Sequence, residues 1–208
     1  MSEPRGRRAL LLDGRADESD ATLASLHGAL LDGLTAGGWA VDDWTLRDAD
    51  IAYCTGCFTC WVKTPGECAH KDAGHEVAER AEHADLWVFL TPVTFGGYSS
   101  TLKRALDHII PILLPFLIKE GDETRHPLRY DHRQDLLVVG VVPKGAAEGA
   151  EAQTFRRLVE RNTLNMRPPR WAAGVVEQGT GDRELRLQVS GLLAEAGAAP
   201  AGAKEVVA

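Results

Sequence analysis

Short apolar runs alternate along the chain with longer segments in which apolar residues recur at helical spacing. The runs have the length of strands: Ala9–Leu12, Trp39–Leu46, Leu86–Leu90, Leu136–Val142 and the weaker Trp171–Val176. The helical segments follow them: Ser19–Thr35, Ala73–His83, Ser99–His108, Gly149–Asn162 and Asp182–Ala196. Strand and helix alternating in this way predict an α/β fold, in which a doubly wound, five-stranded parallel sheet carries helices on both faces.

The composition indicates one globular domain. We expect it to cover residues 1–196, followed by a flexible tail rich in Ala, Gly and Pro over residues 197–208. The 208 residues are 44% hydrophobic and 25% charged, which is ordinary for such a domain. The formal net charge of −7 disfavours nucleic acid or an anionic membrane as the main partner, because both attract cationic surfaces.

The longest apolar run, Ile109–Ile118, is too short to span a bilayer, and two prolines interrupt it. We interpret it as core or subunit interface and favour the interface, because large apolar surface patches usually mark contacts. The start of the chain lacks the pattern of a secretory signal. We therefore expect a cytoplasmic protein without a membrane segment.

In a sheet of this kind, ligands bind beyond the carboxyl ends of the strands. Three loops lie at those ends and are the candidate binding loops: Asp13–Thr22, Thr91–Ser99 and Pro143–Gly149.

All four cysteines fall in one segment, CTGCFTCWVKTPGEC, as Cys54, Cys57, Cys60 and Cys68. The gaps of two, two and seven residues let successive thiolates turn toward one centre, in the manner of iron–sulfur ligand runs. A tetrahedral zinc site is chemically possible, although its cysteines usually come as two separated pairs. Two other interpretations remain. The cysteines are either reduced, unmetallated thiols on a loop beside a cofactor, or they form a redox disulfide.

The cysteine segment together with TPVTFGGYSSTLKRALDHIIP, Thr91–Pro111, resembles a known family. The chain looks like the flavodoxin-like NAD(P)H-dependent FMN reductases, and specifically like their iron–sulfur flavoprotein branch. This resemblance implies a sheet of strand order 2-1-3-4-5, FMN as cofactor, NAD(P)H as electron donor and a [4Fe-4S] cluster held by the four cysteines. It also implies a homodimer or homotetramer that reduces a small acceptor or a redox partner protein.

The resemblance also assigns cofactor-binding residues. The isoalloxazine ring of FMN would lie along Pro92, Val93, Thr94, Phe95 and Gly96, with Phe95 or Tyr98 packed against it. The phosphate would lie at the start of the first helix, near Gly14, Arg15, Ser19 and Thr22. A turn rich in Pro and Gly lets backbone approach a flat ligand, and a helix N-terminus favours an anion. The simpler interpretation of the loop Thr91–Ser99 is that it only connects a strand to a helix, which Ser99 or Ser100 caps.

The phosphate loop departs from the family pattern. Asp17 stands where the family has Arg, and Glu18 and Asp20 add further negative charge beside the expected phosphate. Two smaller departures are Asp72-Ala73, where an acidic pair is usual, and Asp107-His108, where Asp-Arg is usual.

A polar cluster lies in HPLRYDH, with His126, Arg129, Tyr130 and His132. These side chains either line the cofactor cleft or a dimer interface, or are structural.

Three functions follow from these patterns. The leading hypothesis is an FMN-dependent NAD(P)H oxidoreductase of the flavin, quinone or small-acceptor type, in which the flavin supplies the chemistry. The second is an FMN and iron–sulfur electron carrier without its own small substrate. The third is a degenerate, non-catalytic subunit, which the acidic phosphate loop motivates.

Overall fold

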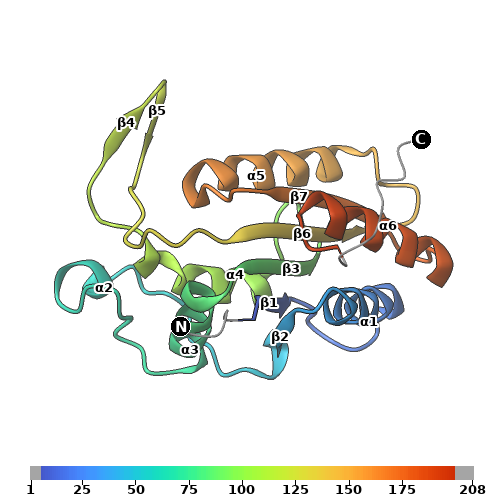
Figure 1. Ribbon diagram of the computed structural model, residues 1–208, viewed down its shortest axis with the longest axis horizontal. Coiled ribbons are helices and arrows are strands. Elements are labelled where there is room, and N and C mark those ends of the chain that lie inside the picture. Colours follow the sequence, from blue (N-terminus) through green and yellow to red (C-terminus); the bar gives the residue numbers. More distant parts are fainter. Residues whose placement is uncertain (1–5, 200–208) are drawn as a thin grey trace.

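A five-stranded parallel sheet forms the centre of the molecule in a computed structural model that describes residues 6–199 (Figure 1). Its strands are β1 (Arg8–Asp13), β2 (Ala40–Thr45), β3 (Leu86–Pro92), β6 (Asp135–Val142) and β7 (Trp171–Glu177). They pair in parallel in the order β2-β1-β3-β6-β7. The predicted fold class and strand order are therefore confirmed.

Helices cover both faces of the sheet. One face carries α1 (Ala21–Ala36) and α6 (Asp182–Glu195), and the other carries α3 (Ala73–His83), α4 (Ser100–His108) and α5 (Ala150–Met166). Successive strand residues point to opposite faces, so Leu11 enters the core under α1 while Leu12 enters the core under α4. The central strands β1, β3 and β6 are mostly apolar because both of their sides are buried, whereas the edge strand β2 carries two aspartates and has no buried position.

The short elements were not predicted. They are the helix α2 (Thr59–Val62), the single turns η1 (Leu46–Asp48) and η2 (Ile110–Ile112), and an antiparallel hairpin of β4 (Ile118–Glu120) and β5 (Glu123–Arg125). The hairpin turns at Gly121, whose φ is 61°. It projects from the domain beyond the end of α5 (Figure 1), and Arg161 of α5 holds it by donating to both carboxylate oxygens of Glu123, at 2.6 and 2.9 Å.

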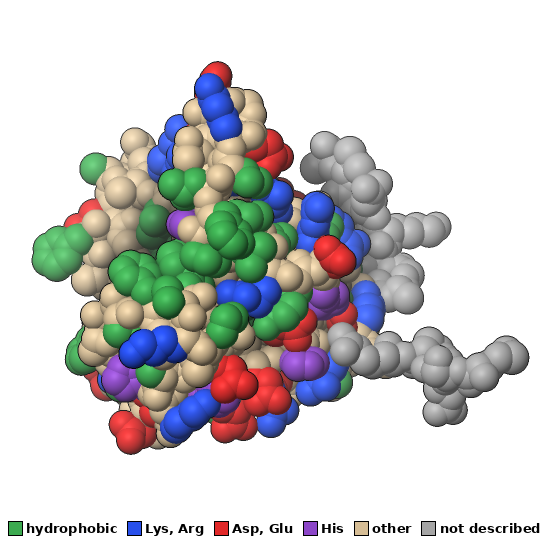
Figure 2. Space-filling model, turned by 90° about the vertical axis from the view of Figure 1, so that its left-hand side faces the viewer, with side chains coloured by type: hydrophobic (Ala, Val, Ile, Leu, Met, Phe, Trp, Pro, Cys, Tyr) green, Lys and Arg blue, Asp and Glu red, His purple; other side chains and the backbone are tan. Residues whose placement is uncertain are grey.

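The apolar run Ile109–Ile118 is divided between core and surface. Ile109 and Pro111 are buried, whereas Phe116 and Leu117 each leave 66% of their surface exposed. Figure 2 shows a broad hydrophobic area on the side of the molecule from which the hairpin projects. Residues 53–62, in and just before the cysteine segment, and the apolar run that leads to the hairpin carry the exposed side chains of Tyr53, Phe58, Val62, Ile110, Phe116 and Leu117, which together we call the apolar face.

The domain extends past the predicted boundary at residue 196. Gly197 has a φ of 72°, and Ala198 is fully buried, with its carbonyl accepting from the indole of Trp39 at 3.1 Å. The rest of the predicted tail, from residue 200, lies outside the described residues. Among the helices of residues 6–199, none combines the length and the apolar character needed to cross a bilayer.

Candidate functional site

Direct hydrogen bonds tie the loop after β1 to the segments that follow β3 and β7. The amide of Gly14 donates to the carbonyl of Leu90 at 2.8 Å, and the hydroxyl of Ser99 donates to the carbonyl of Gly14 at 2.7 Å. After β7, the side-chain amide of Gln178 donates to the carboxylate of Asp20 at 2.9 Å. Two of the loops that the sequence singled out, those after β1 and β3, are therefore joined directly.

The loop after β3 is a tight turn with an exposed aromatic tip. Thr94 and Gly97 exchange two backbone hydrogen bonds, of 3.0 and 2.9 Å, and the residues between them have positive φ, 51° for Phe95 and 73° for Gly96. That is the pattern of a type I′ turn. The turn's hydrogen bonds leave the amides of Phe95 and Gly96 unused. A Cβ on Gly96 would come within 2.7 Å of Thr154 of α5, so only glycine fits there.

Phe95 is an unusual residue for this place. Its side chain is 92% exposed, and positive φ is costly for a bulky residue. Neither packing nor backbone preference explains it. Strained, exposed positions of this kind cluster at functional sites.

Tyr98, the alternative ring partner, is half-buried and packs against the core. Its ring packs edge-on against Phe89 and Phe155, and its hydroxyl accepts from the side-chain amide of Asn162 at 2.8 Å. Burial raises the pKa of Tyr98 to about 12. Phe95 is therefore the more accessible of the two aromatic residues for a flat ligand.

The loop after β1 and the start of α1 differ from an open anion site. Asp20 is the N-cap of α1, and one of its carboxylate oxygens accepts from the amides of Thr22 and Leu23, both at 3.0 Å. The hydroxyl of Thr22 accepts from the amide of Gly179 at 3.0 Å. Two of the donors that a helix N-terminus normally offers to a phosphate are thus already satisfied by the protein's own carboxylate.

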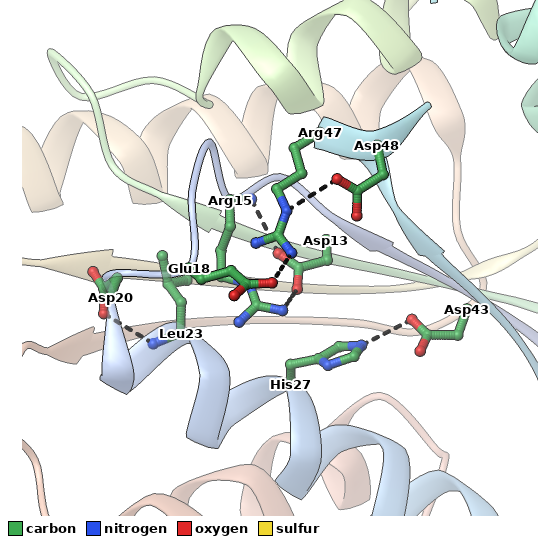
Figure 3. Close-up of polar contacts among 9 residues, drawn as sticks. All are labelled: Asp13, Arg15, Glu18, Asp20, Leu23, His27, Asp43, Arg47 and Asp48. Carbon is green, nitrogen blue, oxygen red and sulfur yellow. Dashed lines mark hydrogen bonds and ion pairs between the residues drawn. The ribbon is translucent and has the colours of Figure 1, made fainter. Parts of the chain in front are cut away.

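The two arginines of this region are also paired (Figure 3). Arg15 lies 2.7 Å from the fully buried carboxylate of Asp13 and also donates to it through its backbone amide at 3.0 Å. Arg47, just after β2, lies 2.5 Å from Glu18 and 3.2 Å from Asp48. The sequence reading missed Arg47, because no local pattern links residue 47 to a loop at residue 18.

Ser19, predicted to bind the phosphate, is hydrogen-bonded to Asp17. Both its amide and its hydroxyl donate to the Asp17 carboxylate, and these hydrogen bonds lower the pKa of Asp17. Asp17 is therefore ionised at neutral pH. The predicted residues Gly14, Arg15, Ser19 and Thr22 do lie together, and each already has hydrogen-bond partners within the protein.

The four cysteines border one small hollow beside α2. Cys54 and Cys57 are exposed, Cys60 and Cys68 are half-buried, and all four are free thiols. Burial, together with the neighbouring cysteines, raises the pKa of Cys60, whereas hydrogen bonds with Thr59 lower the pKa of Cys57. Among the described residues, no three side chains of Cys, His, Asp or Glu are gathered tightly enough to hold a metal ion as they stand. The donor chemistry suits an iron–sulfur cluster, but the ligand role of the cysteines stays a prediction.

Asp72 and His108 hold the cysteine segment at its start. The Asp72 carboxylate accepts from the amide of Ala52 at 2.8 Å and caps α3, while Nε2 of His108 lies 2.9 Å from the carbonyl of Ala52. His108 is almost fully buried, and a Cβ on Gly74 would lie 2.6 Å from its ring. Asp72 and His108, one from each of the two smaller departures from the family pattern, therefore both bind the backbone of Ala52. Asp107 forms an ion pair with Lys103 on the surface of α4.

Side chains of the HPLRYDH cluster make contacts that hold neighbouring segments together, while a role at a cofactor cleft or a dimer interface stays a prediction. His126 lies 2.9 Å from the carbonyl of Phe116, Arg129 donates to the carbonyl of Pro111 at 2.8 Å, and His132 lies 2.8 Å from the carbonyl of Ala84. The ring of His126 also packs against Trp61, with centroids 4.8 Å apart. These contacts fix the segment below the hairpin.

The loop after β6 is shaped by Glu177, which the sequence reading did not single out. The Glu177 carboxylate, at the end of β7, accepts from the amide of Ala147 at 3.0 Å. Hydrogen bonds from the amides of Ala147 and Gly145 lower the pKa of Glu177. The loop thus presents its own backbone beside the β3–α4 turn with one carboxylate tied down.

Comparisons with known proteins agree with this architecture. The sequence model of the NADPH-dependent FMN reductase family matches residues 19–178. An iron-sulfur flavoprotein of Archaeoglobus fulgidus is 31% identical over 83 residues, which are 40% of this chain and 37% of that protein. One of Methanocaldococcus jannaschii is 32% identical over 75 residues, which are 36% of this chain and 38% of that protein. These matches span less than two fifths of each relative's length.

Solved structures share the whole fold. An NAD(P)H:quinone oxidoreductase from Methanothermobacter marburgensis superposes with a TM-score of 0.64 at 14% identity, covering 93% of this chain and 94% of that one. An FMN-dependent NADH-azoreductase from Bacillus anthracis, in complex with FMN, gives 0.61 at 13% identity, covering 89% and 99%. At such identities the likeness establishes the fold. With the family match across most of its length, this chain belongs to the NADPH-dependent FMN reductase family.

Proposed function

We propose that this chain is a flavin-dependent NAD(P)H oxidoreductase, with its flavin ring lying on the turn after β3. The observation that carries the proposal is Phe95, an aromatic side chain that is 92% exposed on a backbone of positive φ. A planar ligand stacked on Phe95 would give that costly arrangement a purpose. Family membership supplies the flavin chemistry.

The residues of the turn fit the ring of a flavin. The amides of Phe95 and Gly96, which the turn does not use, can donate to the polar edge of the ring, and Thr94 offers an exposed hydroxyl beside them. Pro92 and Val93 fix the base of the turn, since the amide of Val93 donates to the carbonyl of Val141 at 2.8 Å. The turn is therefore rigid where it meets the ligand.

A bound flavin accepts a hydride from NAD(P)H and passes two electrons to an acceptor such as a quinone, another flavin or a redox protein. The chain itself has to bind and orient the ring and leave its other face open to nicotinamide. The exposure of the turn provides that access.

A second candidate function is electron transfer through an iron–sulfur cluster as well as the flavin. Its specific support is that Cys54, Cys57, Cys60 and Cys68 border one hollow, and that iron-sulfur flavoproteins are among the relatives. Four thiolates would hold a [4Fe-4S] cluster, which exchanges single electrons. Iron and acid-labile sulfide in anaerobically purified protein would support this function, and loss of both in Cys57→Ser would tie them to the segment. A protein that takes up neither element on anaerobic reconstitution would contradict it.

We further propose that the apolar face joins two copies of this chain. Its large side chains, among them Phe116 and Leu117, are exposed to water in the single chain, which is unfavourable for a surface of that size (Figure 2). Sedimentation should show a dimer or a tetramer, and Phe116→Asp should lower its mass to that of a monomer. A monomeric wild-type protein would overturn the proposal.

The test of the catalytic proposal is NAD(P)H oxidation with added flavin and a quinone acceptor. Phe95→Ala should raise the flavin concentration needed for half-maximal rate about fivefold, since a stacking contact is worth about 1 kcal/mol. It should leave stability unchanged, because the side chain is almost fully exposed. Leu187→Ala, which truncates a 62% exposed side chain on α6, is the control and should change neither quantity. Wild-type protein inert toward both nucleotides with every flavin would refute the function.

A further inference from the structure

We propose that the flavin this chain takes is one whose ribityl chain ends in a neutral hydroxyl, the riboflavin class, and that the protein discriminates against the phosphate of FMN. This inference rests on the proposed function, since it concerns the far end of the same ligand. The inference is drawn from the acidic loop between β1 and α1, where several hydrogen-bond donors and both arginines are already paired within the protein.

The first step concerns backbone donors. A phosphate site at a helix N-terminus depends on amides that point at the anion without other partners. Here five of the amides in this region already have acceptors inside the protein, at 2.8–3.0 Å: those of Gly14, Arg15, Ser19, Thr22 and Leu23. A phosphate would have to displace the protein's own acceptors to reach them.

The second step concerns the two guanidinium groups. Figure 3 shows Arg15 and Arg47 converging on this region, each against a carboxylate. Asp13, which pairs with Arg15, is 0% exposed, so neither member can turn to solvent without leaving a buried charge. Arg47 is shared by Glu18 and Asp48. Each guanidinium charge is therefore balanced by a carboxylate, although Nε of Arg15 and one terminal nitrogen of Arg47 keep an N–H without a hydrogen-bond partner among the described residues.

The third step is the charge balance. Asp17 and Asp20 lie beside the paired groups, and within residues 6–199 neither carboxylate forms an ion pair. Besides the hydrogen bonds from Ser19, the charge of Arg47 helps to lower the pKa of Asp17. The two carboxylates leave the expected phosphate position with an excess of negative charge, which repels a dianion. A carboxylate accepts hydrogen bonds and donates none, as does an ionised phosphate, so the two cannot satisfy each other. A hydroxyl can donate to these same carboxylates, which makes the loop a suitable end for an unphosphorylated ribityl chain.

The match to the family sequence model is consistent with this departure, because it begins at residue 19 and leaves out the segment from Gly14 to Glu18. The ring-binding turn after β3 lies inside the matched region.

The experiment is an equilibrium titration of the whole chain, freed of flavin, with riboflavin and with FMN at low and at high salt. We expect riboflavin to bind at least as tightly as FMN. Salt should strengthen FMN binding by screening the repulsion and leave riboflavin binding unchanged. FMN binding tenfold tighter than riboflavin, and weakened by salt, would overturn the inference while leaving the proposed function intact. Failure of both flavins to bind would instead refute the proposed function.

A variant isolates the loop charge. Glu18→Gln with Asp20→Asn removes two negative charges, and asparagine keeps the helix cap because Asn caps as well as Asp. FMN affinity should rise about tenfold or more, while riboflavin affinity stays within about twofold. The control is Glu79→Gln with Glu195→Gln, two exposed carboxylates on the C-terminal halves of α3 and α6. It makes the same change in net charge and should alter neither affinity; an equal gain of FMN affinity in the control would overturn the role of the loop.

Discussion

The ion pair between Asp13 and Arg15 supports the sharpest prediction about stability. Asp13 ends β1 with its side chain 0% exposed, and the Arg15 side chain is only 10% exposed. Asp13→Asn removes the charge that compensates the guanidinium but keeps an oxygen for the backbone amide of Arg15. A guanidinium left buried without its partner typically costs 3–5 kcal/mol, and the slight exposure of Arg15 places our expectation at about 3 kcal/mol.

Urea unfolding measures this loss. With a slope of about 2 kcal/mol/M, the midpoint should fall by about 1.5 M at unchanged slope. Asp32→Asn is the matched control, because Asp32 also pairs with an arginine, Arg186, at 3.0 Å, but both side chains are more than half exposed. That variant should lose no more than about 0.5 kcal/mol.

A second variant makes the reasoning refutable. Replacing both partners, Asp13→Asn with Arg15→Met, removes the uncompensated charge and should be more stable than Asp13→Asn alone. The freed guanidinium of Asp13→Asn should in turn let inorganic phosphate stabilise that variant and not the wild type. A loss below about 1 kcal/mol in Asp13→Asn, equal to a surface pair, would show that Arg15 is not committed to Asp13.

Three further predictions concern pH and packing. The hydrogen bond to Asp43 raises the pKa of His27, so its stabilising effect is present below pH 6.5 and lost as pH rises through the folded-state pKa; unfolding measured across pH should lose this dependence in Asp43→Asn. Burial raises the pKa of Tyr98 from 10.0 to about 12, so stability should fall between those pH values in an alkaline titration, and Tyr98→Phe should remove that fall. Gly140→Ala would place a methyl 2.5 Å from a core phenyl ring, and thermal melts should show a loss of about 1–3 kcal/mol.

The fold was predictable because its signal is repeated in every strand. The run that became β6 is buried at each of its positions from Asp135 to Val142, and only a doubly covered parallel strand reads that way. The predicted elements agree with the observed ones to within a few residues. The hairpin β4–β5 escaped prediction because its three-residue strands bury no continuous face and therefore leave no periodic pattern.

The site was predictable only in part. The turn after β3 is a local motif, so Phe95 and Gly96 could be singled out from sequence. The partial burial of Tyr98 could not, because it depends on contacts with Phe155 of α5. The ion pair of Arg47 with Glu18 joins segments that are 29 residues apart, and no local sequence pattern in either segment predicts it. The sequence shows an excess of acidic residues near Gly14, but only the structure shows which hydrogen-bond donors their carboxylates accept from.

The central claim is that this chain reduces a bound flavin with NAD(P)H. The most direct measurement is the visible spectrum of flavin-loaded protein, under anaerobic conditions, before and after one equivalent of NADH or NADPH. We predict that the oxidised flavin bands of the wild type bleach rapidly and return on admission of a quinone. A bound flavin that neither nucleotide reduces would contradict the account.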